Sequence, residues 1–207
     1  MTVEAFIDVG TNSTNLLVTD GGSGITRRIA VTRLGEGLHS SGLLSPAAIE
    51  RTVSVIAQHT DTARTLGANT VTVVGTAACR RAHNTSELVA AVHDATGLVL
   101  EVISPEEEAR LSFIGAVRGL PGLDTEGDVM VVDIGGGSTE ISIGADIPRT
   151  SFSIPIGAVT ATESDLTTDP PRPEDLTNVI GAVQDELEEI GRTAPGALTA
   201  GRAVGVA

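Results

Sequence analysis

Residues 6–18 read FIDVGTNSTNLLV, and residues 131–143 read VVDIGGGSTEISI. In each stretch an apolar run leads into an aspartate, then a glycine turn, a Ser-Thr pair and a second apolar run. The two aspartates, Asp8 and Asp133, are 125 residues apart (133 − 8), and Gly, Ser and Thr recur at the same offsets after them. Two apolar runs around a glycine turn predict a β-hairpin. The chain therefore contains one hairpin twice, which indicates a duplicated unit.

The elements predicted after each hairpin follow the same order. In the first unit, periodicity and turn residues predict strands over 3–9, 16–19, 25–32, 71–74 and 98–103, and helices over 46–66, 86–96 and 105–118. In the second unit they predict strands over 129–133, 140–143, 150–154 and 203–206, and a helix over 174–190. The first unit thus reads βββαβαβα and the second βββαβ.

Residues 121–128, PGLDTEGD, have the composition of a linker. We therefore expect one domain over residues 1–124 and a second, truncated at its C-terminus, over residues 125–207. A truncated sheet has an open edge, which a second copy of the chain could cover in a homodimer.

Composition excludes several classes of function. All 13 basic residues are arginine, so a GxxxxGK[ST] phosphate loop and a Schiff-base lysine are absent. The net charge of −14 argues against broad binding to nucleic acid or to an anionic membrane. Apolar runs are too short for a membrane span, and no signal peptide is recognisable. We expect a cytoplasmic protein.

The two glycine turns have the chemistry of phosphate-binding loops. Glycines let successive backbone N–H groups close around phosphate oxygens, and hydroxyl side chains add donors. Asp8 and Asp133, which would repel phosphate, suit a divalent cation or its waters. Ordinary hairpin turns remain an alternative, although two copies in register favour a pair of loops that clamp a phosphate chain across a cleft. The candidate phosphate-binding residues are Gly10, Thr11, Asn12 and Ser13 in the first loop and Gly135, Gly136, Gly137 and Ser138 in the second.

Six segments together carry a resemblance to a known family. They are residues 8–17 DVGTNSTNLL, 33–38 RLGEGL, 75–84 GTAACRRAHN, 103–116 ISPEEEARLSFIGA, 131–140 VVDIGGGSTE and 153–163 SIPIGAVTATE. On these segments the chain resembles the exopolyphosphatase and guanosine pentaphosphate phosphohydrolase family of the actin-like ATPase superfamily. The resemblance implies an α/β fold of duplicated actin-like (ribonuclease H-like) βββαβαβα domains, the second one truncated here.

The resemblance also implies roles for single residues. Glu108 would be the catalytic base that activates water, and Arg80 would bind phosphate oxygens. Asp133 and Glu140 would position Mg²⁺ (or Mn²⁺), and Asp8 would share this role from the first loop. Local sequence alone leaves other roles open, because first-turn glutamates stabilise a helix through its dipole and an exposed arginine is common on any surface.

The expected function is hydrolysis of terminal phosphates of inorganic polyphosphate with magnesium, with guanosine pentaphosphate as the neighbouring substrate. Phosphoanhydride hydrolysis needs a cation, donors for the developing charge and a base that orients water. Two alternatives stay open: a sugar or acid kinase of the same superfamily, and a non-catalytic sensor of phosphorylated nucleotides.

Overall fold

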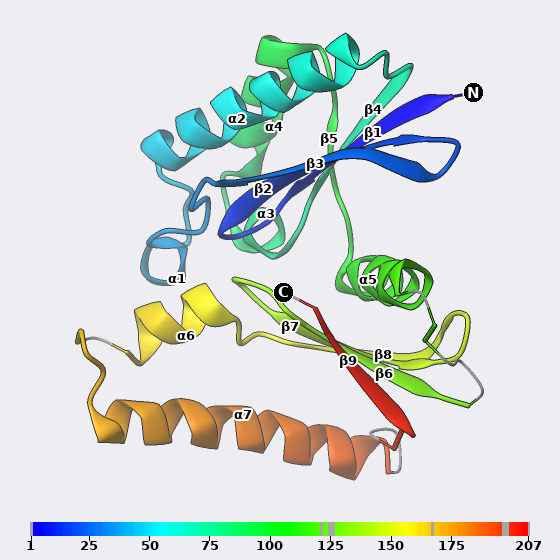
Figure 1. The fold of residues 1–207 in the computed structure, drawn as a ribbon. Coiled ribbons are helices and arrows are strands. Elements are labelled where there is room, and N and C mark those ends of the chain that lie inside the picture. The colour runs from blue at the N-terminus through cyan, green and yellow to red at the C-terminus, as the bar shows by residue number, and fades with distance from the viewer. Residues whose placement is uncertain (1, 121, 124–126, 167, 196–198, 207) are drawn as a thin grey trace. The chain divides into compact units, whose positions relative to one another are not determined.

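The computed structural model describes all residues except 1, 121, 124–126, 167, 196–198 and 207. The chain forms two compact units, Met1–Ile103 and Ser104–Ala207, and Figure 1 shows that each contains a β-sheet with helices. The helices that the structure describes include none long and apolar enough to cross a membrane.

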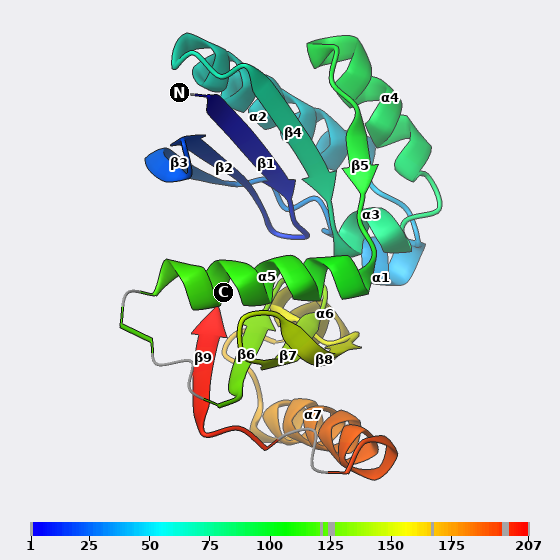
Figure 2. The ribbon, with the colours of Figure 1, turned by 90° about the vertical axis from the view of Figure 1, so that its right-hand side faces the viewer.

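The first unit is built on a five-stranded sheet with the order β3-β2-β1-β4-β5. Strand β1 is antiparallel to β2 and parallel to β4. The strands are β1 (Val3–Val9), β2 (Ser13–Asp20), β3 (Ser23–Val31), β4 (Thr70–Gly75) and β5 (Leu100–Val102). The helices are α1 (Leu38–Ser41), α2 (Pro46–Thr65), α3 (Ala77–Arg81) and α4 (Thr85–Thr96). Figure 2 shows α2 and α4 on the same side of this sheet.

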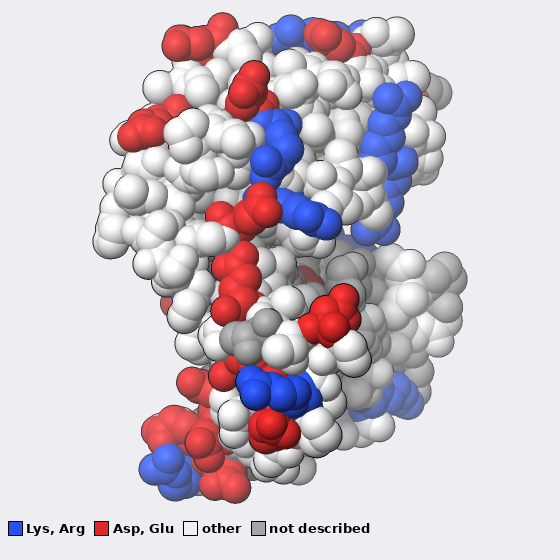
Figure 3. Space-filling model, turned by 90° about the vertical axis from the view of Figure 1, so that its left-hand side faces the viewer, with Lys and Arg blue, Asp and Glu red and all other residues white. Residues whose placement is uncertain are grey.

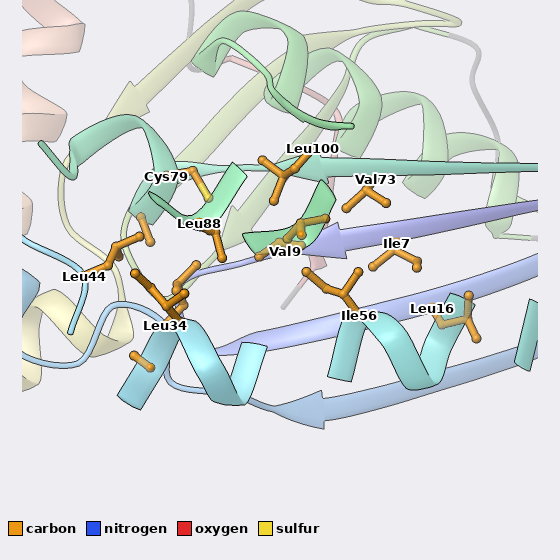
Figure 4. Close-up of a cluster of buried hydrophobic side chains, with 14 of the residues drawn as sticks. Ile7, Val9, Leu16, Leu34, Leu44, Ile56, Val73, Cys79, Leu88 and Leu100 are labelled. Carbon is orange, nitrogen blue, oxygen red and sulfur yellow. The ribbon is translucent and has the colours of Figure 1, made fainter. Parts of the chain in front are cut away.

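The core of the first unit lies between the sheet and these two long helices. Alternate residues of β1, Ile7 and Val9 among them, are fully buried against Ile56 of α2 and Leu88 of α4 (Figure 4). Helix α2 begins as expected, because the Ser45 hydroxyl accepts a hydrogen bond from the third amide of the helix at 3.2 Å.

The second unit has a four-stranded sheet with the order β8-β7-β6-β9. Its strands are β6 (Val129–Ile134), β7 (Thr139–Gly144), β8 (Pro148–Ile154) and β9 (Arg202–Val206), and its helices are α5 (Pro105–Gly119), α6 (Ala158–Ser164) and α7 (Pro173–Thr193). Phe113 of α5 is buried against Val129 and Val131 of β6. Met130 and Val132, which alternate with Val129 and Val131 along β6, pack in a cluster with Ile190 of α7. Helices α5 and α7 therefore cover opposite faces of this sheet.

Strand order confirms the duplication. The first four strands of the first unit are arranged as β3-β2-β1-β4 and those of the second unit as β8-β7-β6-β9, and in both units the first strand is parallel to the fourth. The expected duplicated α/β fold is therefore correct, and the four-stranded second sheet has β9 at one edge.

The structure differs from the sequence expectations in three places. The two units divide at 103/104 rather than at 124/125, because α5 packs against β6, β7 and β8 of the second sheet. The short helices α1, α3 and α6 were not predicted, since four to seven residues show too little periodicity. The predicted linker over 121–128 lies partly outside the described residues. The expected homodimer and cytoplasmic location stay predictions.

Candidate active site

The two glycine turns have the same backbone geometry. The Gly10 N–H donates to the Ser13 carbonyl at 2.9 Å, and the Gly135 N–H donates to the Ser138 carbonyl at 3.0 Å. A Cβ on either glycine would lie 3.1 Å from that carbonyl oxygen. Because closure and packing agree, the repeat found in the sequence is also a repeat of local structure.

Each turn is tied from one side by the segment that follows the third strand of its unit. In the first unit the Thr11 carbonyl accepts from the Gly35 N–H at 2.9 Å, and the Asn12 carbonyl accepts from the N–H groups of Thr32 and Arg33 at 3.0 and 2.8 Å. In the second unit the carbonyls of residues 135 and 136 accept from the N–H groups of residues 158 and 159 at 2.9 and 2.8 Å.

These contacts fix the direction of the loop amides. In a planar trans peptide the C=O and the following N–H point in opposite directions. The N–H groups of Asn12 and Ser13, and those of Gly136 and Gly137, therefore point away from the supporting segment. Successive N–H groups that point to one side form a concave anion-binding site. This orientation is compatible with the predicted phosphate loops, and phosphate binding stays a prediction.

The aspartate before each turn has a different cross-strand neighbour in the two units. Asp8 lies opposite Asn15, whose Nδ2 donates to Oδ2 of Asp8 at 3.1 Å. Asp133 lies opposite Glu140, which occupies the position equivalent to Asn15 (15 + 125). The first unit therefore pairs its carboxylate with an amide, whereas the second sets two carboxylates side by side.

The pair Asp133 and Glu140 is the best candidate for a cation site. Ser112 Oγ donates to Asp133 Oδ2 at 2.5 Å and Ser153 Oγ donates to Glu140 Oε1 at 2.9 Å. Glu140 is only 2% exposed. Like charges directly opposite each other destabilise a sheet, and burial makes a carboxylate more costly still, so a bound cation would relieve both effects.

The donor set fits magnesium. Mg²⁺ takes oxygen ligands, keeps several waters and is bound by one or two carboxylates with substrate phosphates. Within the described part of the chain, no group of three or more His, Cys, Asp and Glu residues is placed to hold a metal ion. Two carboxylates beside the second glycine turn would therefore suit a hydrated Mg²⁺ ion whose other ligands are water and phosphate oxygens.

Glu108 lies on α5 one turn before Ser112, the residue that contacts Asp133. Residues four apart lie on the same helix face, so Glu108 shares a face of α5 with the group that reaches the end of β6. Glu107 is engaged elsewhere: its carboxylate accepts two hydrogen bonds of 2.8 Å from Arg110, which lower the pKa of Glu107. The spacing places Glu108 on the helix face that carries Ser112, and its role as catalytic base stays a prediction.

The same contacts correct a detail of the helix start. Ser104 caps α5 by accepting from the Glu107 N–H at 3.2 Å. The expected capping box also needs the Glu107 side chain to return to the Ser104 N–H, whereas this side chain pairs with Arg110. The serine cap is therefore present, whereas the Glu107 side chain forms an ion pair with Arg110 in place of the return hydrogen bond to Ser104.

Arg80 lies at the same sheet edge as the first loop. The Thr76 N–H, just beyond β4, donates to the carbonyl of Val9 at 3.2 Å, and the Arg80 N–H donates to the Thr76 carbonyl at 3.0 Å. Arg80 Nη1 donates to the Ile103 carbonyl at 3.1 Å. This contact orients a half-buried guanidinium, and binding of phosphate by Arg80 stays a prediction.

The predicted residues therefore form two groups. Asp8, the loop 10–13 and Arg80 lie in the first unit, and Glu108, Asp133, Glu140 and the loop 135–138 lie in the second. The expected clamp of the two loops across a cleft stays a prediction.

Sequence reasoning missed the hydroxyls that hold the carboxylates. Ser112 and Ser153 were not singled out, although Ser112 follows Glu108 by four residues on a predicted helix. Ser153 lies directly opposite Glu140 on β8, which only the strand register reveals. Figure 3 shows that both acidic and basic side chains are exposed on each of the two units.

Comparison with known proteins agrees with this geometry. The sequence profile of the Ppx/GppA phosphatase family matches residues 12–207. Exopolyphosphatase 2 of Mycobacterium tuberculosis is 36% identical over 208 residues, which cover 94% of this chain and 65% of that protein. The chain thus spans about two thirds of the length of this relative.

Solved structures give the same answer. An exopolyphosphatase-like protein superimposes with a TM-score of 0.90 at 32% identity, over 100% of this chain and 66% of its own. The Ppx/GppA family member of Aquifex aeolicus gives a TM-score of 0.76 at 33% identity, over 99% and 65%. MreB5 of Spiroplasma citri, at 14% identity and a TM-score of 0.51 over 94% and 80%, shows the fold alone. The actin-like fold expected from the sequence is therefore confirmed.

Proposed function

Because the chain belongs to the Ppx/GppA phosphatase family, we propose that it hydrolyses terminal phosphates of inorganic polyphosphate, with Mg²⁺ or Mn²⁺ at the reacting phosphate. The observation that carries the proposal is the pair of turns with outward amides, one of which adjoins the Asp133 and Glu140 carboxylates. Guanosine pentaphosphate also ends in a phosphoanhydride and is the second candidate substrate. The relative from Mycobacterium tuberculosis is named for polyphosphate, which favours that substrate.

Binding of the substrate falls to the loops and to Arg80. The amides of Asn12, Ser13, Gly136 and Gly137 orient phosphate oxygens, and the Arg80 guanidinium offsets their charge. The contact of Arg80 with the Ile103 carbonyl fixes the side chain before substrate arrives, so less side-chain entropy is lost on binding.

The carboxylates of the second unit divide the remaining roles. Asp133 and Glu140 would hold the cation, which supplies charge stabilisation for the departing phosphate when it is bound. The hydroxyls of Ser112 and Ser153 keep both carboxylates oriented. Glu108 accepts a proton from the attacking water and directs its oxygen at the terminal phosphorus.

The two alternatives are less well supported. A kinase of the superfamily and a non-catalytic sensor would both retain the glycine turns. The curated relatives named here and the family as a whole are phosphatases, and a sensor has no need of a glutamate beside the cation ligands. Neither alternative is favoured by a specific contact.

A phosphate-release assay on long-chain polyphosphate, with Mg²⁺ and with chelator, tests the proposal. We expect release by the wild type only with the cation, and a fall of about 10²- to 10⁴-fold in kcat for Glu108→Gln, the range for loss of a general base. Glu106→Gln is the matched control, because it removes the same charge from the same helical turn. Equal rates for the two variants would contradict the role of Glu108, and a wild type without release would contradict the function.

A further inference from the structure

Arg33 has an unusual backbone conformation for its residue type. Its φ is +48°, and among the described residues it is the only non-glycine with a positive φ. The left-handed region is disfavoured for residues with a Cβ and persists only where the surroundings impose it. Such positions cluster at functional sites, and this one lies between β3 and α1 beside the first glycine turn.

The surroundings of Arg33 hold its backbone from both ends. Its N–H donates to the Asn12 carbonyl of the turn at 2.8 Å. On the other end, Arg51 of α2 donates through Nε to the Thr32 carbonyl at 3.1 Å and through Nη2 to the Arg33 carbonyl at 3.4 Å. Arg51 is itself paired with Glu36 at 2.9 Å. The turn and α2 therefore fix the position of Arg33 together.

The side chain of Arg33 is not used by the fold. It is exposed, and among the residues that the structure describes no partner hydrogen-bonds or ion-pairs with its guanidinium. Three other arginines of this unit are engaged: Arg28 donates to Thr62, Arg51 to Glu36 and Arg64 to the Thr96 carbonyl. The stability of the fold does not explain why a residue with a disfavoured φ and an unpaired guanidinium stands at position 33.

A second unpaired group lies in the adjoining turn. Thr11 is 6% exposed, and its hydroxyl has no hydrogen-bond partner within the described residues. A buried hydroxyl without a partner is destabilising. The turn next to Arg33 thus carries a second feature that the described contacts of the fold do not explain.

We propose that Arg33 binds substrate, and that it contacts a phosphate further along the polyphosphate chain than the one bound by the loop 10–13. This inference rests on the function proposed above. Arg33 adjoins the carbonyl side of the turn, whereas the loop amides point to the opposite side, so its long side chain is better placed for a neighbouring phosphate. Arg51 acts as a positioning residue that holds the Arg33 backbone.

Chain length is the property that this contact sets. A phosphate next to the one in the first subsite exists only in a chain of two or more phosphates, so removal of the guanidinium weakens the binding of long chains and leaves the binding of orthophosphate unchanged. The interaction is present before and during reaction alike, and its loss raises KM while kcat is kept.

The experiment measures binding without turnover and then steady-state kinetics. Long-chain polyphosphate and orthophosphate are titrated by calorimetry in chelator, with wild type, Arg33→Gln, Arg33→Gly and Arg27→Gln. Arg27 is the matched control, because it is an exposed arginine on β3 for which no partner is found among the described residues. We expect Arg33→Gln to weaken long-chain binding about tenfold, the usual scale of one charge-assisted contact, and Arg27→Gln to change it less than twofold.

Arg33→Gly separates charge from folding. Glycine adopts a positive φ freely, so this variant keeps or raises Tm and still loses the affinity that Arg33→Gln loses. Equal affinities of the Arg33→Gln and Arg27→Gln variants for long-chain polyphosphate, or an equal loss of affinity for orthophosphate, would overturn the inference. A wild type that binds polyphosphate through Arg33 and does not hydrolyse it would overturn the proposed function alone.

Discussion

The close approach of Gly157 to the second phosphate loop makes Gly157→Ala a sharp test of the site. An added Cβ would lie 2.6 Å from the Gly135 oxygen and from the carbonyl carbon and oxygen of Gly136. Ordinary contact begins at 3.4 Å, so the loop or the start of α6 must move by about 0.8 Å (3.4 − 2.6). All three atoms are backbone, so no rotamer change relieves the contact.

The displacement has consequences for stability and for catalysis. Insertion of a methyl group into a packed site usually destabilises by about 1–3 kcal/mol. A misplacement of about 1 Å at a reacting group can lower the rate about 100-fold. In the proposed function the loop amides orient phosphate. We therefore expect Gly157→Ala to lower kcat on polyphosphate about 100-fold while the chain still folds.

Thermal unfolding and phosphate release, measured on the same samples, check this expectation. The control is Gly181→Ala in α7, where an added Cβ has no atom within 4 Å. In a helix interior this change stabilises by about 0.5–1 kcal/mol, so activity should be unaltered. If Gly157→Ala retained the wild-type kcat, the loop amides would have no part in the reaction.

Two further predictions concern the two cores. Phe113→Ala removes a fully buried ring between α5 and β6. It should lower the free energy of unfolding of its unit, measured by urea denaturation, by about 3–5 kcal/mol. The exposed Leu111→Ala should cost less than about 1 kcal/mol, and an equally small loss for Phe113→Ala would show that α5 is not packed there. Burial lowers the pKa of His59 although its ring contacts the Thr14 carbonyl. The unfolded chain therefore binds a proton more tightly at His59 than the folded chain does. The free energy of unfolding should be highest above about pH 6.5 and should fall as the pH drops below that value. Denaturation across this range should show a steeper loss in the wild type than in His59→Gln, and parallel curves would refute the assignment.

Much of the fold could be predicted from local patterns. Strand β1 has the bounds expected from its apolar alternation, and α2, α4 and α5 begin and end within two residues of their predicted limits. Their signals are local: Ser-Pro at the starts of α2 and α5, and Gly97 with a left-handed φ of 74° after α4. The sequence assigned α5 to the first unit, whereas it packs against the second sheet, because an apolar helix face does not indicate which sheet it will cover.

The candidate site could likewise be predicted from the sequence only in its local features. The repeat around Asp8 and Asp133 specified two glycine turns, since spacing along one strand and its hairpin is fixed by the chain itself. The sequence could not distinguish Glu108 from Glu106 and Glu107.

Tertiary structure decided what depends on partners distant in the chain. The pairing register set Glu140 opposite Asp133, the packing of α5 brought Ser112 to that pair, and hydrogen bonds from the end of β3 gave Arg33 its left-handed backbone. Local propensity acts over a few residues and is therefore legible in the sequence. Contacts between segments 20 or more residues apart depend on how whole elements pack, and only the folded chain determines them.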